Sequence, residues 1–384
     1  MTIPVKKIST FCKTGSGGTP SRSNNAFFEN GTIPWVKSGE LKNRYITEVE
    51  EYITDLAIEK SSAKLVSKGS LLIAMYGATV GEVSQLTFDA TTNQAICNIQ
   101  PDENVCDVNY LYRFLEASKP YLLSRRVGGG QPNISQAVIK DLDVPLPPLA
   151  EQRRIAAILD KADELRQKRE QAIEKLDQLL QATFIDMFGD PVSNPKGWDK
   201  KLLSDLVIID APLVEPMEKE FENLLHYGPD RISKDSGKLL PALTAKEDML
   251  ISKKFLCDDR HILYSKIRPY LNKVAMVQEK CLCSADVYPV EPKSRLTKHF
   301  LWHILRSKSF LDHAETFSNR ANIPKINRNQ FLQYECIVPA MEVQKKFENI
   351  SKDIQKQIDF QNLSLESIEK LFNALQNQAF NGTL

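Results

Sequence analysis

PPLAEQRRI at residues 147–155 and PAMEVQKKF at residues 339–347 open two copies of one sequence element, and the copies lie 192 residues apart. At this single offset the match continues without a gap as far as Phe188 and Phe380. The positions that keep their character are Pro147 and Pro339, Gln152 and Gln344, Ile155 and Phe347, Leu176 and Ile368, and Leu180 and Phe372. The chain therefore contains a duplicated element, which divides it into two similar halves.

Both copies carry an apolar repeat of seven residues, which predicts long helices that pack along a seam. One seam runs through Ile155, Ala162, Arg169, Leu176 and Thr183, and its match runs through Phe347, Ile354, Gln361, Ile368 and Leu375. A companion seam pairs Ile173, Leu180 and Met187 with Leu365, Phe372 and Ala379. Because two similar halves suggest a pseudo-twofold object, we expect the helices, over 150–187 and 340–380, to pack antiparallel.

The segments that precede the helices also match each other. Residues 70–75 form an apolar run that predicts a buried strand, and 260–265 repeats it in the second half. Each strand leads into a turn. The predicted fold class is α/β (α+β), with two similar domains and two long helices. The chain is predicted to consist of a first domain at 1–149, a first helix and linker at 150–190, a second domain at 191–338 and a second helix at 339–384.

The composition is that of a globular protein, with 42% hydrophobic and 26% charged residues. The sequence has no run of 18 apolar residues and no apolar segment after Met1, so we expect neither a membrane span nor a secretory signal. The seven cysteines are scattered, and the close pair Cys281 and Cys283 has no second pair to complete a zinc site. These features favour a cytoplasmic protein with free thiols.

The formal net charge of +1 does not by itself indicate a nucleic-acid binder. The charge is unevenly distributed, because residues 191–338 hold 23 Lys and Arg against 19 Asp and Glu, a net charge of +4. Residues 1–149 hold 15 of each kind. If this chain binds DNA, we expect partner subunits to supply much of the positive charge that neutralises phosphate.

No catalytic constellation is visible in the sequence. His299 and His303 have the i, i+4 spacing of metal ligands, but no Glu lies between them and their neighbours Phe300 and Trp302 are aromatic. The sequence has neither a phosphate-binding loop nor a Gly-x-Ser-x-Gly motif. We therefore predict no catalytic residue and no metal site.

Two loops at equivalent places carry residue types that read DNA bases. In the first half, three glycines at 128–130 lie among Arg125, Arg126, Gln131 and Asn133. Glycine permits close backbone approach, Gln and Asn pair with adenine, and Arg pairs with guanine. The second half offers Asn319, Arg320, Asn322, Lys325 and Asn327. Either loop alone is more typical of a solvated surface, but their equivalent places in a duplicated fold favour DNA contact.

The turns that follow the buried strands are a second candidate for the DNA surface. The residues are Tyr76, Thr79, Asn93 and Gln94 in the first half and Lys266, Arg268 and Tyr270 in the second. Ordinary hairpin chemistry explains these turns equally well. Lys37, after the predicted strand that contains Trp35, is a weaker third candidate, and Trp35 itself is expected in the core.

Three motifs resemble one known family. PPLAEQRRI at 147–155 resembles the P-P-x-x-E-Q-x-x-I signature of the specificity subunit of type I restriction-modification systems. Ile33-Pro34-Trp35 and the junction from Met187-Phe188-Gly189-Asp190-Pro191 to Gly197-Trp198 are similar to that family as well. The second copy of the signature, at 339–344, lacks the second Pro and shifts the Glu.

The resemblance covers essentially the whole chain and implies a division of labour. Each domain would be a target-recognition domain that reads one half of a split sequence in double-stranded DNA, and the two helices would be an antiparallel spacer. The subunit would have no activity of its own. It would recruit two modification (methyltransferase) subunits, which carry S-adenosylmethionine, and restriction subunits with ATP-dependent translocase and nuclease activity. No cofactor is expected in this chain.

The predicted helix length agrees with such a spacer. A helix over the 33 residues from Ile155 to Met187 is about 50 Å long at about 1.5 Å per residue, which exceeds one turn of B-DNA at roughly 34–36 Å. Two other classes stay open. The chain could be a scaffold whose domains bind only protein, which salt-dependent DNA binding would exclude. It could also be a methyltransferase itself, although the Asn/Asp-Pro-Pro-aromatic signature of adenine methyltransferases is missing.

Overall fold

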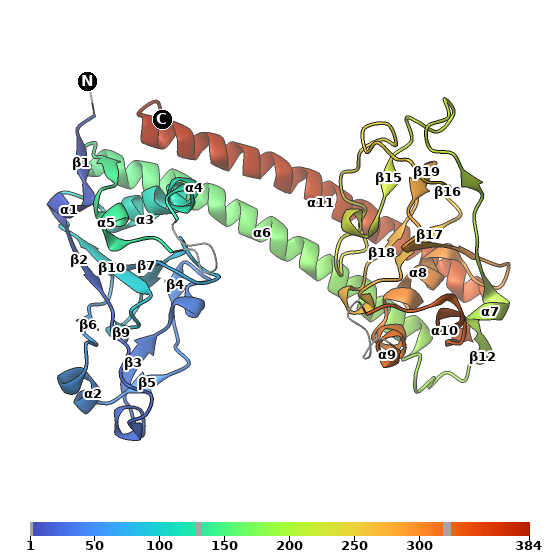
Figure 1. The fold of residues 1–384 in the computed structure, drawn as a ribbon, viewed down its shortest axis with the longest axis horizontal. Coiled ribbons are helices and arrows are strands. Elements are labelled where there is room, and N and C mark those ends of the chain that lie inside the picture. Colours follow the sequence, from blue (N-terminus) through green and yellow to red (C-terminus); the bar gives the residue numbers. More distant parts are fainter. Residues whose placement is uncertain (1–2, 127–132, 318–323) are drawn as a thin grey trace. The chain divides into compact units, whose positions relative to one another are not determined.

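The computed structural model describes residues 3–126, 133–317 and 324–384. The chain divides into two compact units: unit 1 contains Met1–Glu170 and Leu363–Leu384, and unit 2 contains Gln171–Asn362. Both boundaries fall inside long helices. Each unit therefore combines one region of strands and short helices with part of both long helices (Figure 1).

Most strands of unit 1 belong to two sheets with the orders β2-β10-β7-β8-β4 and β5-β3-β9-β6, and β1 pairs separately with β11. In the larger sheet only β4 is parallel to its neighbour. The strands are β1 (Val5–Lys7), β2 (Cys12–Ser16), β3 (Ile33–Val36), β4 (Tyr45–Ile46), β5 (Tyr52–Ile53), β6 (Leu65–Val66), β7 (Leu71–Ala74), β8 (Val83–Leu86), β9 (Ala90–Thr92), β10 (Ile96–Pro101) and β11 (Asp143–Pro145).

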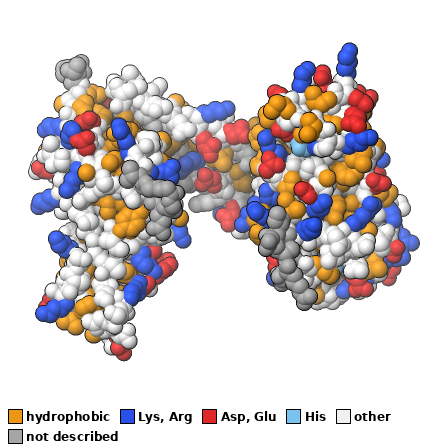
Figure 2. Space-filling model, viewed as in Figure 1, with side chains coloured by type: hydrophobic (Ala, Val, Ile, Leu, Met, Phe, Trp, Pro, Cys, Tyr) orange, Lys and Arg blue, Asp and Glu red, His pale blue; other side chains and the backbone are white. Residues whose placement is uncertain are grey.

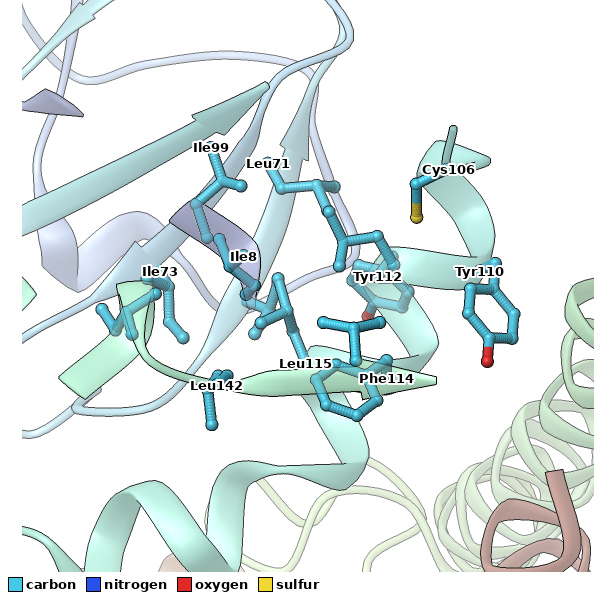
Figure 3. Close-up of a cluster of buried hydrophobic side chains, with 14 of the residues drawn as sticks. Ile8, Leu71, Ile73, Ile99, Cys106, Tyr110, Tyr112, Phe114, Leu115 and Leu142 are labelled. Atoms are coloured by element: carbon cyan, nitrogen blue, oxygen red, sulfur yellow. The ribbon is translucent and has the colours of Figure 1, made fainter. Parts of the chain in front are cut away.

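The short helices of unit 1 pack into two cores: four of them contribute to the core on one face of the larger sheet, and the one at Asp55–Lys60 contributes Ala57 to a separate core with Trp35 and Ile53. They are α1 (Ile8–Phe11), α2 (Asp55–Lys60), α3 (Val108–Ala117), α4 (Lys119–Ser124) and α5 (Gln136–Lys140), with 3-10 turns η1 (Asn25–Phe27) and η2 (Ser38–Glu40). Leu71 and Ile73 occupy alternate positions of β7, and their side chains belong to the same core as Leu115 of α3, which Figure 3 shows. Tyr110 closes this core, and its hydroxyl donates to the Pro145 carbonyl at 2.7 Å.

Unit 2 repeats the central sheet of unit 1. Its order β13-β20-β17-β18 matches β2-β10-β7-β8, and all its pairs are antiparallel. A second sheet has the order β14-β16-β19-β15, and β12 pairs with β21. The strands are β12 (Asp199–Leu202), β13 (Val207–Ile209), β14 (Leu213–Val214), β15 (His226–Tyr227), β16 (Lys254–Cys257), β17 (Ile262–Ser265), β18 (Val274–Met276), β19 (Cys281–Cys283), β20 (Val287–Pro292) and β21 (Glu335–Val338).

The short helices of unit 2 follow the same plan. They are α7 (Leu203–Leu206), α8 (Lys298–Arg306), α9 (Lys308–Thr316) and α10 (Arg328–Leu332), with 3-10 turns η3 (Pro229–Arg231) and η4 (Pro269–Leu271). The helix α8 takes the place of α3, and its Phe300 and Trp302 are buried. The predicted buried strands are thus present in both halves, and the α/β fold class with its internal repeat is confirmed.

The two long helices are α6 (Leu149–Phe188) and α11 (Met341–Asn381). In unit 1 the beginning of α6 meets the end of α11, because Arg154 Nη2 donates to the Leu384 carbonyl at 3.0 Å. In unit 2 the end of α6 meets the beginning of α11, where the rings of Phe184 and Phe347 lie 5.5 Å apart. The helices therefore run antiparallel, as the repeat predicted. The residues of both seams are buried or half-buried.

A buried glutamine explains the repeated Pro-x-x-x-x-Gln spacing. Gln152 accepts from the backbone N–H of Asp107 at 2.8 Å, and its Nε2 donates to the carbonyls of Val105 and Pro147. It thereby fastens α6 to the start of α3. In unit 2, Gln344 does the same: it accepts from the Thr297 N–H at 2.9 Å and donates to two carbonyls.

The two units differ in the side chains that pack beside the contact between the long helix and the short helix. In unit 1 the fully buried Arg113 of α3 forms ion pairs with Glu116, Asp160 and Asp163 at 2.8–3.0 Å. In unit 2 the aromatic rings of α8, α6 and α11 fill the corresponding space. Within the described residues, no helix combines the length and the apolar character that a membrane crossing requires.

Candidate nucleic-acid interface

In each unit, the turn after the buried strand lies beside a described residue from the end of the other segment that was predicted to contact DNA. In unit 1, Tyr76 in the turn after β7 forms an isolated β-bridge with Asn133, and the Ile134 N–H donates to the Met75 carbonyl at 2.7 Å. The turn therefore lies against the segment that follows the triple-glycine loop. Gln131 itself lies outside the described residues.

Unit 2 repeats this contact at the same place in the fold. Ile267, in the turn after β17, forms an isolated β-bridge with Lys325, and the Ile326 N–H donates to the Lys266 carbonyl at 2.9 Å. The structure thus places the turn beside Lys325, a described residue of the second group of predicted DNA contacts. Three of the predicted loop residues lie outside the described part of the chain, namely Asn319, Arg320 and Asn322.

We call the turn after the buried strand, held by its bridge to Asn133 in unit 1 and to Lys325 in unit 2, the pinned turn. Further predicted residues of unit 1 lie around its pinned turn. The Thr79 hydroxyl donates to the Ser38 carbonyl at 2.8 Å, which ties the turn to η2. The Asn93 N–H donates to the Val36 carbonyl at 2.9 Å, so the turn before β10 reaches the end of β3. Gln94 is exposed beside Asn93. Thr79, Asn93 and Lys37, which directly precedes η2, therefore belong to one surface.

Acidic neighbours already compensate the positive charge of Lys37. Its Nζ donates to Glu50 at 2.6 Å and to Glu51 at 2.9 Å. These hydrogen bonds raise the pKa of Lys37 above its usual value. Glu51 is shared with Arg22, whose guanidinium binds both of its carboxylate oxygens. A phosphate contact by Lys37 would therefore compete with two carboxylates.

Arg125 and Arg126 lie at the exposed end of α4. The guanidinium of Arg125 stacks over the ring of Tyr121, with 5.1 Å between the guanidinium carbon and the ring centroid. Arg126 Nε donates to the Leu123 carbonyl at 2.8 Å. Both side chains are exposed. They supply cationic groups directly before the loop that was predicted to contact DNA.

In unit 2, two predicted residues have structural partners. Lys266 Nζ donates to the Ala285 carbonyl at 2.7 Å and lies 3.3 Å from the Asp286 carboxylate. Asn327 is the N-cap of α10, because its side chain accepts from the Gln330 N–H at 2.9 Å. Capping of a short helix is a sufficient reason for an Asn at that position. Base contact by Asn327 therefore stays a prediction.

The remaining predicted residues of unit 2 are exposed. Arg268 and Tyr270 project from the turn after β17, and Lys325 belongs to the segment that pins it. Sequence reasoning missed Thr19, whose hydroxyl contacts the Gln94 side chain. The signal was its place in the loop of small and polar residues at 14–25, which was not connected with Gln94.

The visible surface of each unit carries mixed charge. Basic and acidic side chains are interspersed in Figure 2, and neither unit presents a field of one sign on the face shown. Among the described residues, no group of three or more His, Cys, Asp or Glu is arranged to hold a metal ion. The site therefore offers hydrogen-bonding groups and separate cations on a rigid frame, which suits contact with a polyanion through shape and specific side chains.

Comparison with known proteins gives consistent matches over almost the whole chain. Residues 2–175 and 195–370 each match the family model described as the type I restriction modification DNA specificity domain. The specificity subunit of the type I restriction enzyme MjaIX from Methanocaldococcus jannaschii is 25% identical over 402 residues, which cover 97% of this chain and 91% of that protein.

Two solved structures share the fold. The S subunit of a type I restriction-modification system from M. genitalium superposes with a TM-score of 0.61 at 15% identity, over 99% of both chains. A chain from a structure of type I restriction-modification complex assembly and conformational transition superposes with a TM-score of 0.54 at 15% identity, over the full length of both chains.

Proposed function

This chain belongs to the family of type I restriction modification DNA specificity domains, of which it carries two copies, and from that premise we propose that each unit reads one half of a bipartite DNA target. The observation that carries this proposal is the pair of pinned turns. The frame is the same around Tyr76 and Asn133 as around Ile267 and Lys325, whereas the side chains displayed on it differ. A repeated frame with different side chains is what two readers of different half-sites require.

The proposed DNA surface consists of exposed side chains at these turns. In unit 1 it contains Arg125, Arg126 and Asn133, with Gln131 between them in sequence. In unit 2 it contains Arg268 and Lys325, with Arg320 and Asn322 in the adjoining loop. Arg pairs with guanine and Asn or Gln with adenine through two hydrogen bonds each, so these residue types can discriminate bases.

The helices α6 and α11 are proposed to set the number of base pairs between the half-sites. The helix α6 continues without a break through the boundary between the units at Glu170 and Gln171. Seven additional residues would lengthen a helix by about 10 Å, which corresponds to about three base pairs of B-DNA at about 3.4 Å each. Length changes in whole heptads preserve the register of the seams.

Catalysis is proposed to come from other polypeptides. Two modification subunits would bring S-adenosylmethionine and methyl transfer, and restriction subunits would bring ATP-dependent translocation and cleavage. Large apolar side chains on α11 are exposed and support a surface for partner subunits: Phe360 is 61% exposed, Leu363 64% and Leu371 54%. Exposed apolar side chains on the face of a helix that points away from its own core are typical of helix-binding partners. Membership of a family of DNA specificity domains disfavours the alternative, a scaffold that binds no DNA.

The proposal can be tested with the complex of this chain and its modification subunits. The target is first read from the methylated motif in the source genome. Duplexes altered in one half or the other are then bound to wild type, Asn133→Ala and Arg320→Ala. We expect Asn133→Ala to relax discrimination in one half only and Arg320→Ala in the other half only, by about 1–3 kcal/mol for a lost base contact. Equal relaxation of both halves by either variant would refute the assignment of one unit to one half.

A further inference from the structure

The turn after the central strand needs left-handed backbone at two positions in both units. In unit 1 these positions are Gly77, with φ +90°, and Gly81, with φ +83°. In unit 2 they are Arg268, with φ +49°, and Asn272, with φ +46°. The two members of each pair are four positions apart, so the two turns place left-handed residues at matching points.

The hydrogen bonds confirm that these turns are equivalent. The Val80 N–H donates to the Gly77 carbonyl at 3.3 Å, and the Leu271 N–H donates to the Arg268 carbonyl at 2.9 Å. Both turns are also closed by a backbone hydrogen bond across the turn. Its N–H donor is Ala74 in unit 1 and Ser265 in unit 2. Arg268 therefore occupies the position that unit 1 fills with Gly77.

Arginine is an unfavourable residue for this position. A left-handed backbone brings Cβ close to the following carbonyl oxygen, and only glycine, and to a lesser degree Asn and Asp, adopt it readily. Among the described residues, the other non-glycine residues with positive φ are Asn30, Asn194, Asp235, Met249 and Asn272. Four of these five are Asn or Asp. Arg268 thus keeps a side chain where the fold prefers none.

No contact within the described chain explains that side chain. Arg268 is exposed, and its guanidinium has neither a hydrogen bond nor an ion pair among the described residues. A Cβ at Gly77 would meet nothing within 4 Å, so the equivalent point in unit 1 faces open space. The strain at Arg268 is therefore not offset by packing, and a functional reason for the side chain is indicated.

The backbone of Arg268 is fixed on both sides. Its N–H donates to the Pro324 carbonyl at 2.6 Å. Ile267, directly before it, forms the bridge to Lys325, and Pro269, directly after it, is buried. The guanidinium therefore projects from a rigid anchor, in contrast to a cation on a free loop.

We propose that Arg268 reads a guanine in the half-site of unit 2. This inference rests on the proposed function, in which unit 2 contacts one half of the target. Arginine donates two hydrogen bonds to guanine O6 and N7 in the major groove, and this contact requires a well-defined starting point. A phosphate contact tolerates displacement, and the exposed Lys325 beside the turn could supply one without strain. Unit 1, with Gly77, reads its half-site without a side chain at this point.

Replacement by glycine separates structure from function at this position. Arg268→Gly restores the residue of unit 1 and relieves the strain, so we expect Tm to rise by about 2–4 °C. We expect the same variant, in complex with the modification subunits, to bind the target duplex roughly 10- to 100-fold more weakly. Discrimination is lost at one G·C pair in one half. Arg268→Lys retains the positive charge but cannot donate the bidentate pair of hydrogen bonds, so it should lose the same discrimination.

Asn272→Gly is the matched control, because it removes the other left-handed side chain of the same turn. Its Nδ2 donates to the Arg306 carbonyl within the unit at 3.2 Å, and we expect DNA binding to stay within twofold of wild type. Uniform weakening of all duplexes by Arg268→Gly would indicate a phosphate contact and overturn the base-reading role, and unchanged binding would overturn any DNA role. Failure of the proposed function is recognised separately, because wild type would then not discriminate changes in either half.

Discussion

Replacement of Gln152 by alanine should destabilise unit 1 severely. Gln152 is 1% exposed and serves three backbone groups: the N–H of Asp107 and the carbonyls of Val105 and Pro147. Each lost hydrogen bond costs about 1 kcal/mol and more if its partner stays buried without water. The cavity left by the amide adds about 1 kcal/mol. We therefore expect a loss of about 4 kcal/mol in the free energy of unfolding.

The measurement is urea unfolding of the full chain, with hydrogen exchange to assign the change to one unit. Protection should fall at α3 and at the first turns of α6, because these are the elements that Gln152 connects. Gln344→Ala should produce an equal loss in unit 2, at α8 and the first turns of α11. Gln178→Ala is the matched control, because this glutamine lies exposed on α6 and, among the described residues, its side chain bonds to Glu174 alone. Its effect should stay within about 0.5 kcal/mol.

A loss below about 1.5 kcal/mol for Gln152→Ala would refute this reasoning, since it would mean that water satisfies the three backbone groups. Loss of protection spread evenly over both units would also contradict it. Gln152→Glu gives a further check. It keeps the size of the side chain but removes the Nε2 donor, so it should be at least as destabilising as the alanine variant.

Three further predictions concern the long helix α6, the source of methyl transfer and the buried histidines of unit 2. Insertion of seven residues in α6 after Arg169 should lengthen the spacer of the methylated target by about three base pairs and leave both half-sites unchanged; altered bases with an unchanged spacer would contradict the spacer role. The purified chain alone should transfer no methyl group from S-adenosylmethionine to target DNA, and detectable methylation would overturn the assignment of catalysis to partners. Burial lowers the pKa of His299 to about 4 and that of His303 well below its usual value, so the unfolded state takes up protons first as the pH falls below about 6.5. Unit 2 should therefore lose about 1 kcal/mol per buried histidine between pH 7.5 and 5.5, whereas unit 1, which has no histidine, should not; urea unfolding with hydrogen exchange at both pH values tests this, and His299→Gln should reduce the change.

The large-scale plan of the fold was predictable because repetition leaves a signal that a single element does not. The ungapped offset located both long helices to within one residue at each end, and the pseudo-twofold relation of the two halves predicted their antiparallel pairing. The glutamine spacing was visible as well, but not its three backbone partners. These depend on Val105 and Asp107, which lie more than 40 residues away in the sequence.

The candidate site was predictable only in outline. The sequence presents Lys37 as an available cation, whereas Glu50 and Glu51, which bind it, lie on a different segment. The left-handed Arg268 was hidden as well, because a residue before proline is ordinarily expected to be extended. The burial of Arg113 was not predictable either, because Asp160 and Asp163, which bind it, belong to α6. For Lys37 and Arg113, the decisive partners lie on other segments of the chain.

The division of the chain has a consequence for how it is made on the ribosome. Unit 1 needs Leu363–Leu384, since Phe372 and Ala379 complete the core that contains Ile155 and Leu159. All of unit 2 is synthesised in between. At about 5–20 residues per second, this interval lasts on the order of 10–40 s. During that time the apolar side chains that Phe372 and Ala379 later cover lack these partners, so we expect the nascent first unit to bind chaperones.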